Sequence, residues 1–416
     1  MTDSRTRLLA LALQRASFLH AAEKLKLWDI VDDAASLSVL SLRDLEAALG
    51  RRLESGRWNP ASLLAQAEAD ALLLERIGAR FVCYDESEYP PLLRETAQPP
   101  FGLYVRGPML RPDRAAVSIV GTRLPTGRGL ETARRLAREF SRAGVTVVSG
   151  LARGIDGAAH RGALDAAAGS GRARSASGGD AGRSAGPAGG FGGAGSARVA
   201  GSTCAAGLTC AVLPCGIDAV YPPSNRNLAA AILDSGGLLL SEYPPGTDIQ
   251  KYRFPERNRI IAGVARACVV VEAPLGSGAL ITATEALGEG RDLWVAAACL
   301  GGSRSGGIDR LASEGAPLIG TAGDMLSDWG LALPERPEAR DEPLRAWTPA
   351  LGAGASGAEC PSADEGRRLA ESLGAELGLG TRENPAGPAA DTRSRPGAGP
   401  RSGRLDLRER AWTAEE

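Results

Sequence analysis

The chain has 416 residues, which is long enough for two or three domains with a sizeable buried core. Its 44% hydrophobic and 23% charged residues are typical of a globular protein in water. The formal net charge is −1, so a site for a polyanion would have to be a local cluster of basic residues. Only Lys24, Lys26 and Lys251 among the 48 basic residues are lysines, and we attribute the arginine excess to coding composition.

The cysteine and histidine content argues against a metal site. The seven cysteines form no C-x-x-C pair, the chain has only two histidines, and an odd number of thiols without a signal peptide is typical of a reducing compartment. The longest apolar run, Ile260 to Val271, is interrupted by Arg266 and is too short to span a bilayer. We therefore expect a cytoplasmic protein with no membrane partner and no metal.

The first part of the chain is predicted to be helical. Leucines recur at helical spacing through residues 1–78, and no sustained strand-like alternation is present there. Residues 79–114 contain Tyr89-Pro90-Pro91 and Pro99-Pro100 and are predicted to be a connector. This organisation indicates a small N-terminal helical domain joined to a larger one.

Residues 115–330 show a different pattern, in which short β-branched runs alternate with helices. Continuous apolar strands alternating with helices predict a doubly wound α/β fold around a mainly parallel sheet. The expected strands are Val117–Val120, Val145–Ser149, Thr209–Leu213, Gly237–Ser241, Ala267–Glu272 and Leu293–Ala297. The expected helices include Thr126–Ala143 and Asp156–Ala168, with Asp156 as an N-cap.

Two segments have a composition that does not support a packed core. Residues 169–207 consist largely of Gly, Ala, Ser and Arg, which predicts a disordered insertion within the α/β domain. Residues 331–416 are rich in Pro, Gly, Ala and Arg, which predicts a mostly disordered tail. Ser362 and Glu365 form a capping box in this tail, followed by leucines at helical spacing, so one amphipathic helix is expected there.

The first strand-to-helix turn of the α/β domain combines glycines with arginines. Gly121, Thr122 and Arg123 follow a buried strand, and Gly129 lies in the next helix. Free N–H groups at a helix N-terminus bind anions, but glycine here also suits simple packing, and the two interpretations are about equally favoured. The spacing is not that of a dinucleotide fingerprint, and no acidic residue ends the second strand, so no NAD or other cofactor is expected.

The second such turn, Ser149 to Asp156, carries Gly150 and Arg153. His160 lies four residues after Asp156, so a carboxylate could orient the imidazole as a catalytic base. Such a pair is more often a structural hydrogen bond in the first turn of a helix, and that interpretation is favoured.

The segment Lys251 to Arg259 interleaves basic and aromatic residues before an apolar helix. Phosphates favour Lys and Arg, and unstacked bases favour aromatic faces, so Lys251, Phe254, Arg257 and Asn258 match the pattern of a single-strand binding site. The alternative is a solvated basic loop with Phe254 in the core.

A further turn, Gly276-Ser277-Gly278, follows a buried strand and begins a helix. This arrangement suits a phosphate, although a packing turn is about as well supported by this segment alone. It lacks the lysine of a P-loop, which argues against hydrolysis of nucleoside triphosphates. Asn225, in the loop after the strand Thr209–Leu213, is expected to cap the following helix.

Together these segments resemble the DprA/Smf family of bacterial DNA-processing proteins. The order and spacing of the matching strings carry the resemblance, since each string alone is short. They are Ile119-Val120-Gly121-Thr122-Arg123, Ser149-Gly150 with Gly154-Ile155-Asp156, Gly216-Ile217-Asp218 with Tyr221-Pro222, Ser241-Glu242, Phe254-Pro255 with Arg257-Asn258-Arg259, and Ser277-Gly278-Ala279-Leu280-Ile281-Thr282.

The resemblance implies a Rossmann-like core that forms a homodimer, binds single-stranded DNA without strong sequence preference, and helps load RecA during transformation and recombination. It implies that Arg123 and Lys251 contact phosphate and that Phe254 stacks on a base. Asn258 and the Gly276–Gly278 turn would line the same pocket. The complete predicted DNA-binding set is Gly121, Thr122, Arg123, Gly150, Arg153, Lys251, Phe254, Arg257, Asn258, Gly276, Ser277 and Gly278.

The alternative function is an enzyme. The family's core is similar to that of nucleotide-binding phosphoribohydrolases, in which a glutamate follows the glycine loop at a fixed step. Here Thr282 stands at the fourth position after Gly278, and Glu285 comes three residues later. Without a carboxylate at that step no catalytic residue is predicted, and a DNA-binding protein that is not an enzyme is favoured. An NAD-dependent oxidoreductase is less favoured still.

Overall fold

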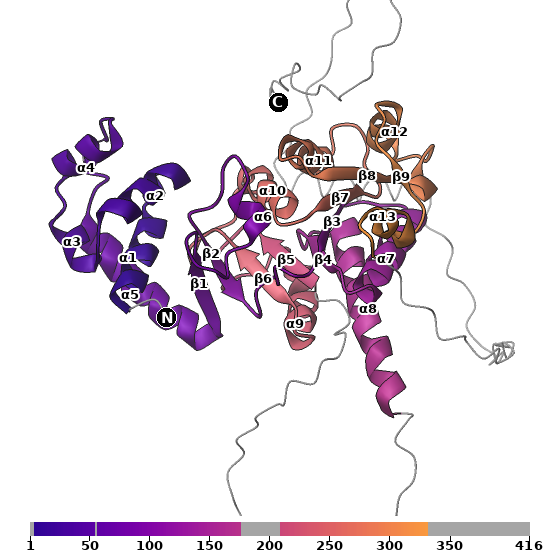
Figure 1. The fold of residues 1–416 in the computed structure, drawn as a ribbon, viewed down its shortest axis with the longest axis horizontal. Coiled ribbons are helices and arrows are strands. Elements are labelled where there is room, and N and C mark those ends of the chain that lie inside the picture. The colour runs from indigo at the N-terminus through magenta and orange to yellow at the C-terminus, as the bar shows by residue number, and fades with distance from the viewer. Residues whose placement is uncertain (1–3, 55, 176–208, 332–416) are drawn as a thin grey trace, which may run out of the picture. The chain divides into compact units, whose positions relative to one another are not determined.

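The computed structural model describes residues 4–54, 56–175 and 209–331 (Figure 1). The tail predicted at 331–416, with its helix after Ser362, lies outside the described residues beyond its first residue. The same holds for the predicted insertion beyond residue 175. Its first residues, however, belong to α8 (Ile155–Ser175), so the helix extends past the expected end at Ala168.

The N-terminal part is helical, as predicted. Local capping explains where its helices begin: the Asp33 carboxylate accepts the Ser36 N–H, and Asn59 accepts the Ser62 N–H immediately before Pro60. Gly78 ends the last helix in a left-handed conformation, which glycine adopts without strain. The helices are α1 (Ser4–Arg15), α2 (Ala21–Ile30), α3 (Ala34–Val39), α4 (Leu42–Leu49) and α5 (Pro60–Ile77).

A nine-stranded sheet follows, with the strand order β1-β2-β6-β5-β4-β3-β7-β8-β9. Strands β3 to β9 pair in parallel, which confirms the doubly wound α/β architecture. The strands are β1 (Ala79–Cys83), β2 (Gly102–Arg106), β3 (Ala116–Val120), β4 (Thr146–Ser149), β5 (Thr209–Leu213), β6 (Leu238–Ser241), β7 (Ala267–Val270), β8 (Asp292–Ala296) and β9 (Leu318–Ile319).

The segment predicted as a connector contributes two of these strands. β1 and β2 pair with each other antiparallel and β2 pairs antiparallel with β6, so they extend the sheet at one edge. Phe81 lies opposite Tyr104 with ring centroids 4.9 Å apart, and both are buried. Because both faces of this strand pair are covered, their sequences show short apolar runs without the alternation that marks a half-exposed strand.

The helices of the α/β domain pack against the sheet, and the helical domain shares a core with part of it. Leu11 and Leu27 of the helical domain belong to the same buried apolar cluster as Tyr104 and Leu239 of strands β2 and β6. The remaining helices are α6 (Pro91–Arg94), α7 (Gly127–Arg142), α9 (Arg226–Asp234), α10 (Arg253–Gly263), α11 (Gly278–Gly288), α12 (Gly306–Ser313) and α13 (Ala322–Asp328). Among the described residues, no helix combines the length and apolarity needed to cross a bilayer.

Candidate nucleic-acid interface

The predicted site residues follow the carboxyl ends of the parallel strands. From the central strand β3 the chain proceeds to β4, β5 and β6 on one side, and then to β7, β8 and β9 on the other. Ligands of such sheets bind at the carboxyl edge where the order reverses, here between β3 and β7. The turn with Arg123 follows β3, the turn with Gly278 follows β7, and the Thr122 N–H bonds the Glu272 carbonyl at 2.7 Å between them.

The N-terminus of α7 is occupied by a carboxylate of the protein itself. Glu272, which is 2% exposed, accepts the Thr126 N–H at 2.8 Å, and the Thr126 hydroxyl accepts the Gly129 N–H at 3.1 Å. A Cβ at Gly129 would lie 2.2 Å from the Glu272 carboxylate oxygen, so a larger residue there would displace that carboxylate. A carboxylate of the protein thus lies at the N-cap of this helix, which no local sequence pattern indicates.

Packing explains the glycines of the first two turns. A Cβ at Gly121 would lie 2.5 Å from Cγ1 of Ile155, and one at Gly150 would lie 2.6 Å from a guanidinium nitrogen of Arg257. Thr122 is buried, and its hydroxyl accepts the Leu124 N–H at 3.2 Å within the turn. The packing interpretation therefore accounts for Gly121 and Gly150.

Arg257 is not placed to contact a ligand, although it belongs to the predicted DNA-binding set. It is 3% exposed, and its guanidinium donates to the carbonyls of Gly150, at 2.8 Å, and Val212. Burial lowers the pKa of Arg257 to about 10, against the opposing effect of the Asp156 carboxylate. Asn258 is also buried and lies beside the Arg257 Nε. Arg257 thus joins the Gly150 turn to β5.

Asp156 and His160 do not form the catalytic pair that was considered. The Asp156 carboxylate accepts the N–H groups of Gly150 and Ala152 at 3.2 and 3.3 Å, and burial raises its pKa. Asp156 thus has a structural role, but it bonds the turn before α8 and not His160, and because α8 already begins at Ile155 it is not the N-cap either. The His160 Nδ1 lies 2.8 Å from the Thr209 hydroxyl, and burial lowers the pKa of His160 to about 3, so the ring is neutral.

Asn225 stands at the N-cap position of α9, as expected, but without the expected capping bond. Its side chain makes no cap to α9. The Asn225 Nδ2 instead donates to the carbonyls of Leu151 and Ala152 at 2.8 and 3.2 Å, which holds the turn that follows Gly150.

The structure brings Arg123 and Phe254 together from distant parts of the chain. The Arg123 guanidinium lies 4.9 Å from the centroid of the Phe254 ring, and Tyr221 approaches the same ring at 5.6 Å, edge to face. Arg123 and Lys251 are exposed, whereas Phe254 is partly buried. Arg153 is exposed as well, with its Nε 3.4 Å from the Ser224 hydroxyl. An exposed cation therefore lies over the face of a partly buried aromatic ring.

The turn before α11 differs from the other two because packing does not explain its second glycine. Gly276 has a φ of +75°, which accounts for glycine there. A Cβ at Gly278 would meet no atom within 4 Å, and the residue is exposed. Ser277 caps α11 by accepting the Ala279 N–H at 3.3 Å. The backbone at Gly278 is thus open to a ligand at the N-terminus of a helix of 11 residues.

Two aromatic residues beside the site, Tyr243 and Tyr252, lie outside the predicted DNA-binding set. Arg253 lies 5.1 Å from the Tyr243 ring centroid and 5.5 Å from that of Tyr252, which is 56% exposed. The alternation Lys-Tyr-Arg-Phe at residues 251–254 indicated Tyr252, whereas Tyr243 lies outside that segment. An exposed aromatic face adjacent to Lys251 matches the composition of a base-stacking surface.

The first carboxylate after the Gly278 turn belongs to Glu285, which does not stand at the position of the glutamate in the phosphoribohydrolases. Glu285 lies seven residues after Gly278, about 10 Å along α11. It is half-buried, and burial together with Glu289 raises its pKa. Thr282, which stands at that position four residues after Gly278, is buried. Within the described residues, no cluster of three or more His, Cys, Asp or Glu side chains could hold a metal ion.

Comparisons with known proteins agree with this arrangement. The sequence pattern of the family described as DNA recombination-mediator protein A matches residues 80–175 and 189–330. The chain is 32% identical to protein Smf of Escherichia coli over 65% of its own length and 63% of that protein's, so it spans less than two thirds of that relative. It is 33% identical to the DNA processing protein DprA of Bacillus subtilis over 64% of its length and 75% of the relative's.

A solved structure supports the same assignment. The X-ray structure of DNA processing protein A from Streptococcus pneumoniae aligns with a TM-score of 0.54 at 28% sequence identity, covering 76% of this chain and 95% of that one. The strand-to-helix turns described above fall within the region that the family pattern matches. The chain therefore belongs to the DNA recombination-mediator protein A family.

Proposed function

We propose that this protein binds single-stranded DNA without strong sequence preference at the carboxyl edge of its sheet. The observation that carries the proposal is the position of Arg123 over Phe254 at the point where the strand order reverses. Lys251 precedes Phe254 by three residues, and the open turn at Gly278 follows β7, the strand that pairs with β3. Cations for phosphates and an aromatic face for bases are the two elements that single-strand binding requires.

The contact between Arg123 and Phe254 suggests how DNA would bind. A phosphate would draw the exposed Arg123 guanidinium off the ring, because a charge-assisted bond to phosphate is stronger than the contact to the ring. The uncovered face of Phe254 would then stack on a base, while Gly278 N–H and Lys251 take neighbouring phosphates. In this proposal Gly121, Thr122, Gly150, Arg257 and Asn258 shape the pocket, and Arg153 adds an outer phosphate contact.

We infer that the protein acts as a homodimer in the cytoplasm, loads RecA onto single-stranded DNA during transformation and recombination, and has no catalytic activity of its own. Membership of a recombination-mediator family supports the role with RecA. A nucleoside-monophosphate hydrolysis assay tests the last point, and release of the base would overturn it.

Replacing Arg123 or Lys251 with alanine should weaken binding and reduce its salt dependence. Each lost phosphate contact lowers the slope of log affinity against log salt concentration by roughly 0.7 for single strands. Fluorescence anisotropy with labelled oligo(dT) at several salt concentrations measures both quantities. Lys26→Ala is the matched control, because Lys26 is an exposed lysine on α2 of the helical domain. A slope unchanged in the Arg123 and Lys251 variants would remove these residues from the phosphate path.

Replacing Phe254 with alanine should weaken binding by about 1–3 kcal/mol and leave the salt slope unchanged, because stacking involves no phosphate. Phe254→Leu separates stacking from core packing, since leucine retains apolar volume but has no aromatic face. We expect the leucine variant to keep the thermal transition of the wild type and to bind as weakly as the alanine variant. Full binding by Phe254→Leu would show that the side chain acts only in packing.

A further inference from the structure

The segment between β6 and α10 leads directly into the proposed DNA-binding residues. Residues 242–252 contain no regular helix or strand, and Lys251 lies at their end. An irregular segment that is fixed only when DNA binds loses conformational entropy at that moment, on the order of 1 kcal/mol per residue. Contacts that fix the segment beforehand therefore favour binding.

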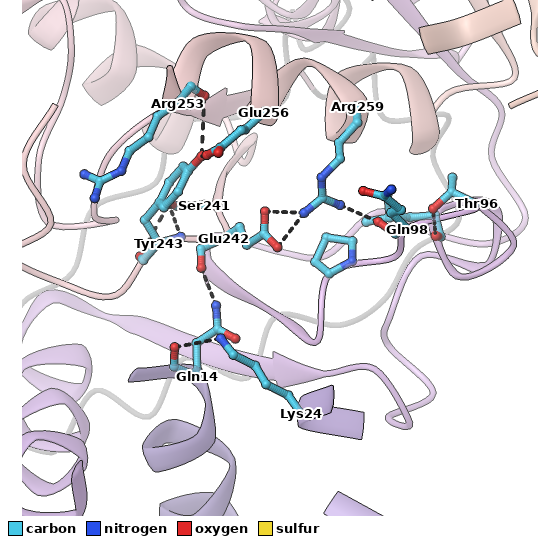
Figure 2. Close-up of polar contacts among 12 residues, drawn as sticks. Gln14, Lys24, Thr96, Gln98, Ser241, Glu242, Tyr243, Arg253, Glu256 and Arg259 are labelled. Carbon is cyan, nitrogen blue, oxygen red and sulfur yellow. Dashed lines mark hydrogen bonds and ion pairs between the residues drawn. The ribbon is translucent and has the colours of Figure 1, made fainter. Parts of the chain in front are cut away.

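The helical domain holds the backbone of this segment at two points. The Gln14 Nε2 donates to the carbonyl of Glu242 at 2.5 Å, and an Arg15 Nη2 donates to the carbonyl of Pro245 at 2.9 Å. Arg15 is itself held by Asp70 of α5 through a two-bond ion pair, with 2.7 Å between Nε and Oδ2, and Asp70 is 2% exposed. Figure 2 shows the Gln14 side chain pointing at the backbone of Glu242.

The side chain of Glu242 continues this connection to the helix that carries Phe254. Its carboxylate accepts two bonds from Arg259 of α10, at 2.6 and 2.5 Å, and the pair is only about one-fifth exposed. Arg259 also donates to the Gln98 carbonyl at 2.6 Å (Figure 2). Phe254 lies in the first turn of the same helix. Glu242 thus binds the helical domain through its backbone and α10 through its carboxylate.

The α/β domain also holds this segment, and by more bonds than the helical domain. Besides the Arg259–Glu242 pair, the Tyr243 hydroxyl donates to the Glu256 carboxylate at 3.1 Å and Arg253 donates to the Asp248 carbonyl. The Asp218 carboxylate accepts the Gly246 N–H at 3.0 Å, and the Gly216 N–H bonds the Thr247 carbonyl at 3.3 Å. Loss of the contacts from the helical domain should therefore loosen the segment rather than release it, so the effect on binding should be moderate.

We propose that Gln14, Arg15 and Asp70 of the helical domain are positioning residues that hold the segment 242–252 in place for DNA binding at Lys251 and Phe254. The proposal rests on the proposed single-strand binding function. It gives the helical domain a role in DNA affinity although none of these residues contacts the proposed DNA path.

Two variants of the full chain test this role. Gln14→Leu removes one contact, and its cost in stability should be small because the Gln14 Oε1 is buried without a partner. Arg15→Met/Asp70→Leu removes the second contact and the whole ion pair together, which avoids leaving Asp70 as an uncompensated buried charge. Gln66→Leu is the matched control: Gln66 is exposed on α5 and bonds Ser62 within its own helix.

Three measurements are compared: oligo(dT) affinity, its salt slope, and hydrogen exchange of the peptide that spans residues 242–252. We expect each test variant to bind roughly three- to tenfold more weakly with an unchanged salt slope and faster exchange in this peptide. The control should match the wild type. Faster exchange with wild-type affinity would overturn the positioning role alone, as would unchanged exchange. A wild-type protein that fails to bind oligo(dT) would overturn the proposed function itself.

Discussion

Replacing Arg257 with methionine is expected to lower the free energy of unfolding by about 3–5 kcal/mol, because removing a buried cation leaves the buried polar groups around it uncompensated. The substitution leaves the buried Asp156 carboxylate without its nearby cation and removes the bonds to the Gly150 and Val212 carbonyls. Urea unfolding at neutral pH measures the loss. Arg128→Met provides the matched control, because Arg128 is exposed on α7.

A double-mutant cycle tests whether the loss comes from the charge. Asp156→Asn removes the negative charge and keeps an oxygen that can accept an N–H group. The double variant Asp156→Asn/Arg257→Met should therefore be more stable than the sum of the two single losses implies, with a coupling of 1 kcal/mol or more. Additive losses would contradict the electrostatic role, and Arg257 would then act only through its carbonyl bonds.

Replacing Lys24 with methionine is expected to stabilise the protein at neutral pH. Lys24 is 7% exposed, its ammonium donates to the Gln14 carbonyl at 3.0 Å, and burial lowers its pKa to about 8 from the usual 10.5, against the opposing effect of Glu242 (Figure 2). A shift of this size costs about 3 kcal/mol when the lysine is charged. Subtracting about 1 kcal/mol for the lost hydrogen bond leaves a net gain of roughly 2 kcal/mol.

The sign of the pH dependence follows from proton binding. Between pH 8 and 10.5 the unfolded chain binds more protons at Lys24 than the folded protein, so the wild type gains stability as the pH rises through this window. The advantage of Lys24→Met should therefore be largest at pH 7 and disappear near pH 10. Urea unfolding at both pH values measures it, with Lys26→Met as the exposed control. An advantage that does not change with pH would mean that the lysine's charge is not its cause.

The roles of three arginines in one helix explain why the site could be predicted only in part. Arg253, Arg257 and Arg259 all lie in α10, and nothing in their spacing distinguishes a ligand contact from an internal one. The structure turns Arg257 into the core, where it bonds the backbone after β4 and in β5, whereas Arg259 pairs with Glu242 and Arg253 lies between two tyrosine rings. Which face of α10 meets the sheet decides these roles, and that packing depends on distant segments.

The sequence alone determined the helical N-terminal part, the parallel strands from 116 to 296, and the proximity of Lys251 to Phe254. These features depend on local periodicity, buried parallel strands with continuous apolar runs, and residues adjacent in the chain. Only the tertiary structure decided that Gly129 accommodates the Glu272 carboxylate, that Gly278 remains open, and that Arg123 covers Phe254. It also revealed β1 and β2 and the bonds from Gln14 and Arg15 to the segment after β6. These features depend on residues that are far apart in the chain, so no local sequence pattern indicates them. Thr126 and Glu272, for example, are 146 positions apart.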